Sequence, residues 1–144
     1  MSGFLIDTNV LSEFSRTGEP DQRVKSWLKA APAGSLYASV LTLAEVRRGI
    51  ELLPTGKRRV QLEQWLELEL IECFGANSLP VTMAIADRWA VLSARAQQRG
   101  APLALAFVDG LIAATAIEHG LTLVTRNVKD FADLGVNLFN PWET

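Results

Sequence analysis

Short apolar runs that alternate with longer helix-forming segments constrain the fold of this chain more than any other feature. The clearest runs are Phe4-Leu5-Ile6, 35–39 and 121–125, with weaker ones within 77–81 and at 137–139. Each has the length of a β-strand and is bounded by residues that favour turns or helix starts. Strands separated by helices need crossover connections, so the sequence predicts an α/β fold with a mostly parallel central sheet and helices on both faces.

The segments between these runs carry apolar residues at helical spacing. We expect helices over about 10–16, 21–31, 42–53, 57–70, 82–99 and 106–119,. Thr82 is placed to cap the fifth helix, and Gly100 and Gly120 are placed to end the last two. Trp27, Trp65 and Trp89 lie on helical stripes, where core packing is favoured over a protein interface,.

The length and hydrophobic content of the chain suit one core. The 144 residues are 49% hydrophobic, which predicts a single domain spanning 1–144,. No apolar run is long enough to cross a membrane, and no basic region precedes Phe4 as in a signal peptide,. We therefore expect a soluble, cytoplasmic protein without a membrane partner.

Composition excludes several kinds of chemistry. The single cysteine, Cys73, cannot form an intramolecular disulfide, and the single histidine, His119, cannot build a zinc site or a catalytic triad with it,. Fourteen basic and sixteen acidic residues give a formal charge of −2. Any contact with nucleic acid must therefore be local, because the surface as a whole is not basic.

Asp109 is an acid at a position where the fold alone would not require one. Residues three, four and seven positions later are Ile112, Ala113 and Ala116, so this face of the helix should pack inward,. Burying an unpaired carboxylate costs several kcal/mol unless something compensates its charge. The alternative is an Asp in the first helical turn with its carboxylate in solvent, favoured by the macrodipole by only about 0.3–1 kcal/mol.

Two further acids stand near predicted strand ends. Asp7 follows the first strand, where open parallel sheets place ligand sites, although it could simply cap the next helix,. Glu45 lies three residues after Thr42, and this spacing is also that of a capping box,. Taken alone, Glu45 is therefore explained as well by local structure as by function.

A fourth region follows the 121–125 strand. Thr125, Arg126 and Asn127 lie at its end and Asp130 comes three residues later, although Asn127 to Asp130 could be only a helix start,. In a parallel sheet the ends of this strand and of the first can lie close together. Clustered carboxylates repel one another unless a cation neutralises them, and oxygen-only ligands favour Mg²⁺ or Mn²⁺. Such an ion can activate water to cleave a phosphodiester without a protein nucleophile.

Several stretches of the chain resemble a known family. They are Leu5-Ile6-Asp7-Thr8-Asn9-Val10-Leu11-Ser12, Thr42-Leu43-Ala44-Glu45-Val46-Arg47-Arg48-Gly49, Val108-Asp109-Gly110-Leu111-Ile112-Ala113-Ala114-Thr115-Ala116, Leu123-Val124-Thr125-Arg126-Asn127 with Asp130-Phe131, and Asn140-Pro141-Trp142. In this order they resemble the PIN-domain nucleases, and within them the VapC toxins of bacterial toxin–antitoxin pairs, especially the FitB-like branch. The likeness covers essentially the whole chain.

The resemblance implies a fold and a set of site residues. It implies the three-layer PIN sandwich, with Asp7, Glu45 and Asp109 as metal-binding acids and Asn127 at the family's fourth acidic position. Many relatives carry Asp at that fourth place, so the choice between one and two metals stays open. Asp130, one helical turn later, is a possible substitute. Thr125 is expected to orient water or a carboxylate.

The resemblance also implies an activity and partners. It implies a Mg²⁺-dependent endoribonuclease, the toxin of a type II toxin–antitoxin system, which cleaves RNA through metal-activated water with Mn²⁺ as a possible substitute. A small antitoxin is expected to cover the active-site groove, in a larger complex built on a toxin homodimer that reaches DNA only through the antitoxin. Arg47, Arg48, Arg126 and Lys129 are candidates to lead phosphates to the metal,. The run from 57 to 59, like the Arg47-Arg48 pair, is more simply a solvated face.

Two other kinds of function fit parts of the same pattern. A PIN fold with weak or no cleavage could act as a binding module in a DNA-bound repressor complex, and Asn127 keeps that alternative open. Haloacid-dehalogenase-like phosphatases need a second Asp two residues after the first, where this chain has Asn9, and receiver domains need adjacent acids near the first strand. No glycine-rich phosphate loop precedes any predicted helix, which also disfavours nucleotide cofactors.

Overall fold

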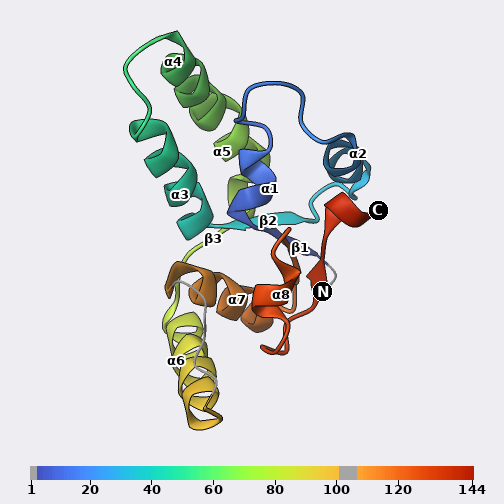
Figure 1. The fold of residues 1–144 in the computed structure, drawn as a ribbon, viewed down its shortest axis with the longest axis vertical. Coiled ribbons are helices and arrows are strands. Elements are labelled where there is room, and N and C mark those ends of the chain that lie inside the picture. Colours follow the sequence, from blue (N-terminus) through green and yellow to red (C-terminus); the bar gives the residue numbers. More distant parts are fainter. Residues whose placement is uncertain (1–2, 101–106) are drawn as a thin grey trace.

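A five-stranded parallel sheet forms the centre of the molecule in the computed structural model, which describes residues 3–100 and 107–144 (Figure 1). The strands are β1 (Phe4–Ile6), β2 (Leu36–Ser39), β3 (Ser78–Leu79), β4 (Thr122–Val124) and β5 (Leu138–Phe139), in the order β3-β2-β1-β4-β5. β1 pairs with β2 and with β4, where Ile6 lies opposite Val124. The predicted α/β class is confirmed, and every strand pair is parallel.

Helices connect the strands and account for most of the chain. They are α1 (Thr8–Ser12), α2 (Gln22–Ala30), α3 (Val40–Glu51), α4 (Lys57–Gln64), α5 (Ile71–Phe74), α6 (Met83–Gln98), α7 (Phe107–His119) and α8 (Val128–Phe131). A π-helical turn, Trp65–Leu70, joins α4 to α5, and short 3₁₀ turns occupy Gly75–Asn77 and Pro141–Glu143. The segment predicted as one helix over 57–70 therefore continues to Phe74 with a change of helical geometry inside it.

The described helix ends follow the capping signals in most places. Thr82 caps α6 as predicted, because its Oγ1 accepts a hydrogen bond from the Ile85 N–H at 3.2 Å. Gly120 follows α7 with φ of +64°, a conformation that glycine adopts without strain,. α1 is shorter than predicted and begins earlier, at Thr8, because Asp7 serves as its N-cap. Residue 106, the predicted start of the last long helix, lies outside the described residues.

The two faces of the sheet pack against different sets of helices. Figure 1 shows α1 to α5 on one side of the sheet and α6 to α8 on the other. Ile6 and Val124 belong to the buried cluster on the first side, whereas their neighbours Leu5 and Leu123 belong to the cluster that contains Ile112 of α7. Successive strand residues thus enter opposite cores, as the pleat requires, and the three-layer arrangement is confirmed.

The tryptophans on helical stripes pack mainly inside the molecule. Trp27 meets Phe4 edge to face at 5.0 Å between ring centroids and lies 5.2 Å from Phe139. Trp65 is half-buried at the edge of the same cluster, and Trp89 packs between α6 and α7. Core packing, the favoured interpretation of these residues, is confirmed. Across residues 3–100 and 107–144, no helix is both long and apolar enough to span a membrane.

Candidate active site

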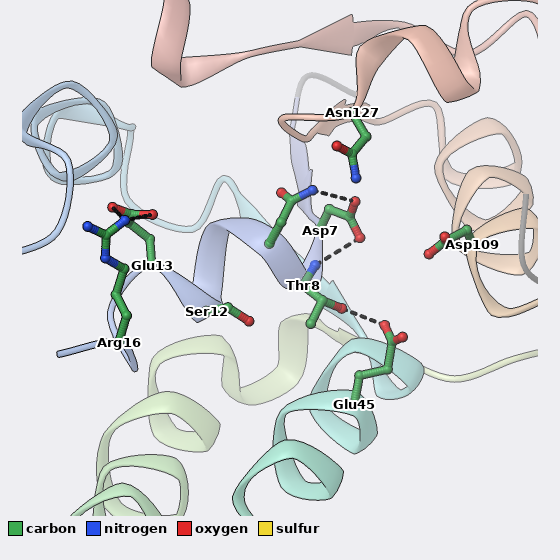
Figure 2. Close-up of a pocket in the computed structure, with 9 residues that line it drawn as sticks. Asp7, Thr8, Ser12, Glu13, Arg16, Glu45, Asp109 and Asn127 are labelled. Atoms are coloured by element: carbon green, nitrogen blue, oxygen red, sulfur yellow. Dashed lines mark hydrogen bonds and ion pairs between the residues drawn. The ribbon is translucent and has the colours of Figure 1, made fainter.

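The acids predicted to form a site line one open pocket at the carboxyl ends of β1 and β4 (Figure 2). The pocket has a volume of about 410 Å³ and is lined by Asp7, Thr8, Asn9, Ser12, Glu13, Arg16, Glu45, Asp109 and Asn127. Asp7 follows β1, Glu45 lies on α3, Asp109 on the first turn of α7 and Asn127 beyond β4. The structure therefore brings all four predicted site residues together from four separate elements.

Asp7 is the most deeply buried acid of the pocket, with 4% of its surface exposed. Its backbone N–H donates to the Val124 carbonyl at 3.0 Å, which continues the pairing of β1 with β4. Its Oδ1 accepts the Thr8 N–H at 2.8 Å, and its Oδ2 accepts the Thr125 hydroxyl at 2.8 Å. Burial raises the pKa of Asp7 more than these hydrogen bonds lower it, with a further rise from the charge of Glu45,. The N-cap interpretation is thus confirmed, and the same carboxylate also lines the pocket.

The Thr125 hydroxyl is held in one orientation by its neighbours. Its Oγ1 accepts the Asn9 Nδ2–H at 3.1 Å and the Asn127 backbone N–H at 3.1 Å. Since a hydroxyl has one proton, that proton is left to donate to Asp7. Asn9 also accepts the Arg126 N–H through its Oδ1 at 3.2 Å, which ties the start of α1 to the loop after β4. Of the two roles expected for Thr125, the structure shows the orientation of a carboxylate.

The capping-box interpretation of Glu45 is wrong. α3 begins three residues earlier than that motif would need, because Ser39 is the N-cap and its Oγ accepts the Leu41 N–H at 3.1 Å. Thr42 is therefore inside the helix with its side chain fully buried. Glu45 instead accepts the Thr8 hydroxyl through Oε1 at 2.5 Å (Figure 2). A residue that follows β1 thus holds this carboxylate at the pocket.

Asp109 faces the pocket from the first turn of α7 and is half-buried. The residues that share its helix face, Ile112, Ala113 and Ala116, are completely buried. Burial, followed by the charges of Asp7, Glu45 and Asp130, raises the pKa of Asp109 to about 6. The alternative of a fully solvated helix-start Asp is therefore wrong, because this carboxylate lies in a shielded and negatively charged setting.

The region after β4 contributes Asn127 to the pocket but not Asp130. Asn127 precedes α8 at its N-cap position, yet its side chain makes no capping hydrogen bond and lines the pocket instead. Asp130 is exposed and does not line the pocket, although its charge reaches Asp109. The fourth position of the cluster is thus a neutral amide, with an acid nearby.

The four basic residues expected to lead phosphates to the metal do not line this pocket. Arg47 pairs with Glu67 at 2.7 Å, and the Arg126 guanidinium lies 5.1 Å from the centre of the Trp142 ring. The pocket is lined instead by Arg16, which the sequence analysis did not select. Arg16 follows the short helix that Asp7 caps, and this proximity in sequence to the first acid was the signal available.

Two other lining residues, Ser12 and Glu13, were also not selected. Both come from the end of α1 and bring a hydroxyl and a carboxylate to the side of the pocket where Arg16 lies. Glu13 is 5% exposed and accepts the Asp21 N–H at 2.8 Å. Glu13 is thus a buried anchor for the loop between α1 and α2.

The donor set of the pocket suits a hard divalent cation. Asp7, Glu45 and Asp109 offer only oxygen atoms, the ligands that Mg²⁺ and Mn²⁺ prefer,. Burial and then the charges of neighbouring carboxylates raise the pKa of Asp109, and a bound cation would relieve the repulsion between those charges,. Within the described residues, no three His, Cys, Asp or Glu side chains are grouped so that they could hold a metal ion as they stand. The type of donor atom thus fits a divalent cation, whereas the side chains would have to move to bind one.

Comparison with known proteins extends these observations to the whole chain. The PIN domain family model matches residues 4–137. VapC ribonuclease Y4jK of Sinorhizobium fredii is 38% identical over 139 residues, or 96% of this chain and 97% of the relative. Toxin FitB of Neisseria gonorrhoeae is 39% identical over 138 residues, again 96% and 97%. A solved structure of FitAB bound to the IR36 DNA fragment has a TM-score of 0.89 and 37% identity, covering 96% of this chain and 95% of that one.

These matches agree with the local geometry. They extend over nearly the full length of the chain, and the stretches on which the family resemblance rested supply Asp7, Glu45, Asp109 and Asn127 to one pocket. This chain belongs to the PIN domain family.

Proposed function

We propose that this protein is a Mg²⁺-dependent endoribonuclease and the toxin of a type II toxin–antitoxin system. The observation that carries the proposal is the convergence of Asp7, Glu45 and Asp109 on one open pocket. There, burial and the charges of nearby carboxylates raise the pKa of Asp109. Membership of the PIN domain family and the relatives named as a ribonuclease and a toxin support it. An RNA phosphodiester is the substrate class that such a pocket would take.

Asp7, Glu45 and Asp109 are the residues that would hold the metal ion. A bound Mg²⁺, or Mn²⁺ in its place, would lower the pKa of a water molecule and neutralise charge that develops on the phosphate. Thr8 and Thr125 donate hydrogen bonds to the Asp7 carboxylate, and the Thr8 hydroxyl donates one to Glu45. The chain therefore orients two carboxylates before any ligand binds. Asn127 offers a neutral amide at the fourth position, which supports one metal rather than two,.

The raised pKa of Asp109 couples metal binding to proton release. With a pKa of about 6, this carboxyl keeps its proton in mildly acidic solution, where it is a poor metal ligand,. Affinity for the metal should therefore rise as pH increases through about 6 and level off above it. Cleavage activity should follow the same curve because the ion is needed for the reaction.

A small antitoxin is the partner that we propose, since a related solved structure is a toxin–antitoxin complex from Klebsiella pneumoniae. A second pocket of about 180 Å³ adjoins the acid pocket and shares Ser12 and Glu45 with it. Its other walls include Val46, Ile50 and Leu53, so an apolar segment of a partner lying there would also cover the acids,. A toxin homodimer, DNA binding through the antitoxin and a cytoplasmic location, where RNA is available, are parts of the same proposal.

RNA cleavage by purified protein tests the function. With Mg²⁺ the parent protein should cut single-stranded RNA, and Asp7→Asn or Asp109→Asn should lower the rate by about 100-fold or more. A chelator should abolish cleavage by the parent. Asp87→Asn, on the exposed face of α6 away from the pocket, is the matched control and should keep full activity. Equal cleavage by the Asp7 and Asp109 variants would contradict the proposed site.

A second candidate function is a PIN-fold binding module that acts with its partner on DNA and cleaves RNA weakly or not at all. Asn127 at the fourth acidic position favours it, since one carboxylate fewer faces the metal. In a related solved structure, FitAB is bound to a DNA fragment, which also supports this candidate. Calorimetric titration separates the candidates, because complete failure to bind Mg²⁺ or Mn²⁺ would favour the module over the nuclease.

A further inference from the structure

Among the described residues that line the acid pocket, Arg16 is the one basic residue. Four carboxylates, those of Asp7, Glu13, Glu45 and Asp109, line the same pocket. Figure 2 shows Arg16 beside Glu13 at one end, with Ser12 between that pair and the other acids. Of the described lining residues, Arg16 alone therefore offers a polyanion a side chain of opposite charge. Arg16 lies apart from the residues assigned to the metal.

The contacts of Arg16 leave most of its guanidinium available. Its Nη1 pairs with Glu13, 3.1 Å from Oε1 and 3.4 Å from Oε2, and in the described part of the chain no other nitrogen of this side chain has a partner. The Arg16 side chain is 56% exposed, whereas Glu13 is 5% exposed and is also anchored by the Asp21 N–H. The pair thus buries its acid and presents its base to the pocket.

Neutralising Glu13 explains only part of this arrangement. A buried carboxylate does need a compensating charge, and Arg16 supplies it,. A guanidinium enclosed with its partner would serve that role as well, yet the Arg16 side chain is more than half exposed and lines the open pocket. A guanidinium fork is suited to the paired oxygens of a phosphate group, and phosphate contacts position a nucleic acid without reading its sequence.

We propose that Arg16 is a substrate-binding residue whose guanidinium donates to a non-bridging oxygen of a phosphate next to the one that is cleaved. The inference rests on the proposed ribonuclease function and adds to it how the RNA strand is held. Because Arg16 lies beyond Ser12 and away from the metal-binding acids, its contact forms in the bound substrate and persists through the reaction,. Loss of the contact should therefore raise KM and leave kcat nearly unchanged.

Steady-state cleavage of a fluorescent single-stranded RNA in Mg²⁺ tests this assignment. Arg16→Gln should raise KM by about tenfold and keep kcat within about twofold, and Arg16→Lys should restore most of the loss because it retains the charge. The slope of log KM against log salt concentration should fall by about 0.7 in Arg16→Gln, the value for one phosphate contact on a single strand. Arg88→Gln removes an arginine that pairs with Glu118 at 2.7 Å outside the pocket. This control variant should keep the KM, the kcat and the salt slope of the parent.

A modified RNA makes the test independent of how the variants fold. An uncharged methylphosphonate at the linkage next to the mapped cleavage site should raise KM for the parent protein by about tenfold and should add nothing in Arg16→Gln. If neither neighbouring linkage responds in the parent, or if folded Arg16→Gln keeps the parent KM and salt slope, the proposal is wrong. A parent protein that cleaves no RNA would contradict the ribonuclease function itself, and the assignment of Arg16 would fall with it.

Discussion

Asp7 and Glu45 reach the pocket by different physical routes. Asp7 is held by the chain on both sides of it, through the backbone bond to Val124 and the side-chain bonds to Thr8 and Thr125. Glu45 is half-exposed and has the Thr8 hydroxyl as its partner. Thr8 thus serves both acids, donating its backbone N–H to one and its hydroxyl to the other, which links the positions of the two carboxylates.

Replacing Thr125 tests the importance of the hydroxyl that orients Asp7. Thr125→Val keeps the shape of a fully buried side chain but removes the donor at 2.8 Å and the acceptor for Asn9 and Asn127. We expect the free energy of unfolding to fall by about 1–3 kcal/mol, because buried polar groups lose their hydrogen-bond partners. RNA cleavage should also fall, since Asp7 is no longer held. Urea unfolding and a cleavage assay measure the two effects.

Thr115→Val is the matched control for that experiment. Thr115 is equally buried, but its hydroxyl donates to the Leu111 carbonyl within α7, away from the pocket. This variant should keep the cleavage rate of the parent. If Thr125→Val also cleaves RNA like the parent, the orienting role of the Thr125 hydroxyl is refuted.

The pH dependence of stability tests the setting of Asp109. The folded pKa, about 6, lies above the ordinary value of 3.8, so the folded protein binds this proton more tightly than the unfolded chain does,. The contribution of Asp109 to the free energy of unfolding is therefore highest below about pH 4, falls as pH rises to about 6 and is constant above that. Asp109→Asn removes the cost of holding an ionised carboxylate at this position. In metal-free buffer the variant should therefore be more stable than the parent at about pH 7, by up to about 1 kcal/mol after solvent screening.

Urea midpoints at several pH values provide that measurement. The difference between Asp109→Asn and the parent should shrink toward zero near about pH 4, where the parent carboxyl is protonated too. Added Mg²⁺ should stabilise the parent and have little effect on the variant. A variant that is less stable than the parent at neutral pH without metal would show that Asp109 is not under electrostatic strain.

At the scale of elements, the packing of α7 on α6 depends on one glycine beside an acid. Gly110 follows Asp109, and a Cβ built on it would lie 2.8 Å from the Trp89 ring. Trp89 in turn meets Phe107 edge to face at 4.8 Å. The indole thus packs directly on the backbone of the first turn of α7, the turn that carries Asp109.

Gly110→Ala should therefore force the two helices apart locally. Overpacking of this kind costs about 1–3 kcal/mol, which exceeds the gain of about 1 kcal/mol expected for alanine over glycine in a helix. We also expect weaker RNA cleavage, because the displaced turn carries Asp109. Thermal unfolding and the cleavage assay are the measurements.

Gly49→Ala provides the control within a helix that faces open space. No atom lies within 4 Å of a Cβ built at Gly49 in α3, so this variant should be as stable as the parent or more so,. Gly110→Ala and Trp89→Ala should not be additive, since both act on one contact. Equal stability of the two glycine variants would show that Trp89 can move at no cost.

Helix boundaries show how far local patterns carry a prediction. Thr82 was correctly identified as a cap because its hydroxyl bonds to a residue three positions away, within reach of a sequence motif. The Thr42-Glu45 spacing is that of a capping box and was misleading, since Ser39 at the end of β2 is the N-cap of that helix,. The end of a strand, which depends on its neighbours in the sheet, decided between two acceptable caps.

At the scale of the whole molecule, the sheet joins the two ends of the chain. β1, near the N-terminus, lies between β2 and β4, so the central pairs connect residues far apart in sequence. Neither the part before β4 nor the part after it contains a complete sheet. The single domain predicted for 1–144 should therefore fold as one cooperative unit.

Equilibrium unfolding in urea tests that cooperativity. Circular dichroism and tryptophan fluorescence should give one transition with the same midpoint. The fluorescence reports on both layers, because Trp27 and Trp142 pack on one side of the sheet and Trp89 on the other. Two separated transitions would show that the layers fold as independent units.

Local patterns in the sequence were enough to predict the fold class, the location of the strands, and Asp7 and Asp109 as candidate site residues, because periodicity, strand ends and acids on apolar faces lie within a few residues of one another. Glu45 and Asn127 were selected only through the family resemblance. The tertiary structure alone decided how the side chains are used. The hydrogen bonds from Thr8 to Glu45 and from Thr125 to Asp7 join residues 37 and 118 positions apart. Arg16 is held at the pocket by an ion pair with the buried Glu13. Such partners follow from the register of parallel strands, which no local pattern contains.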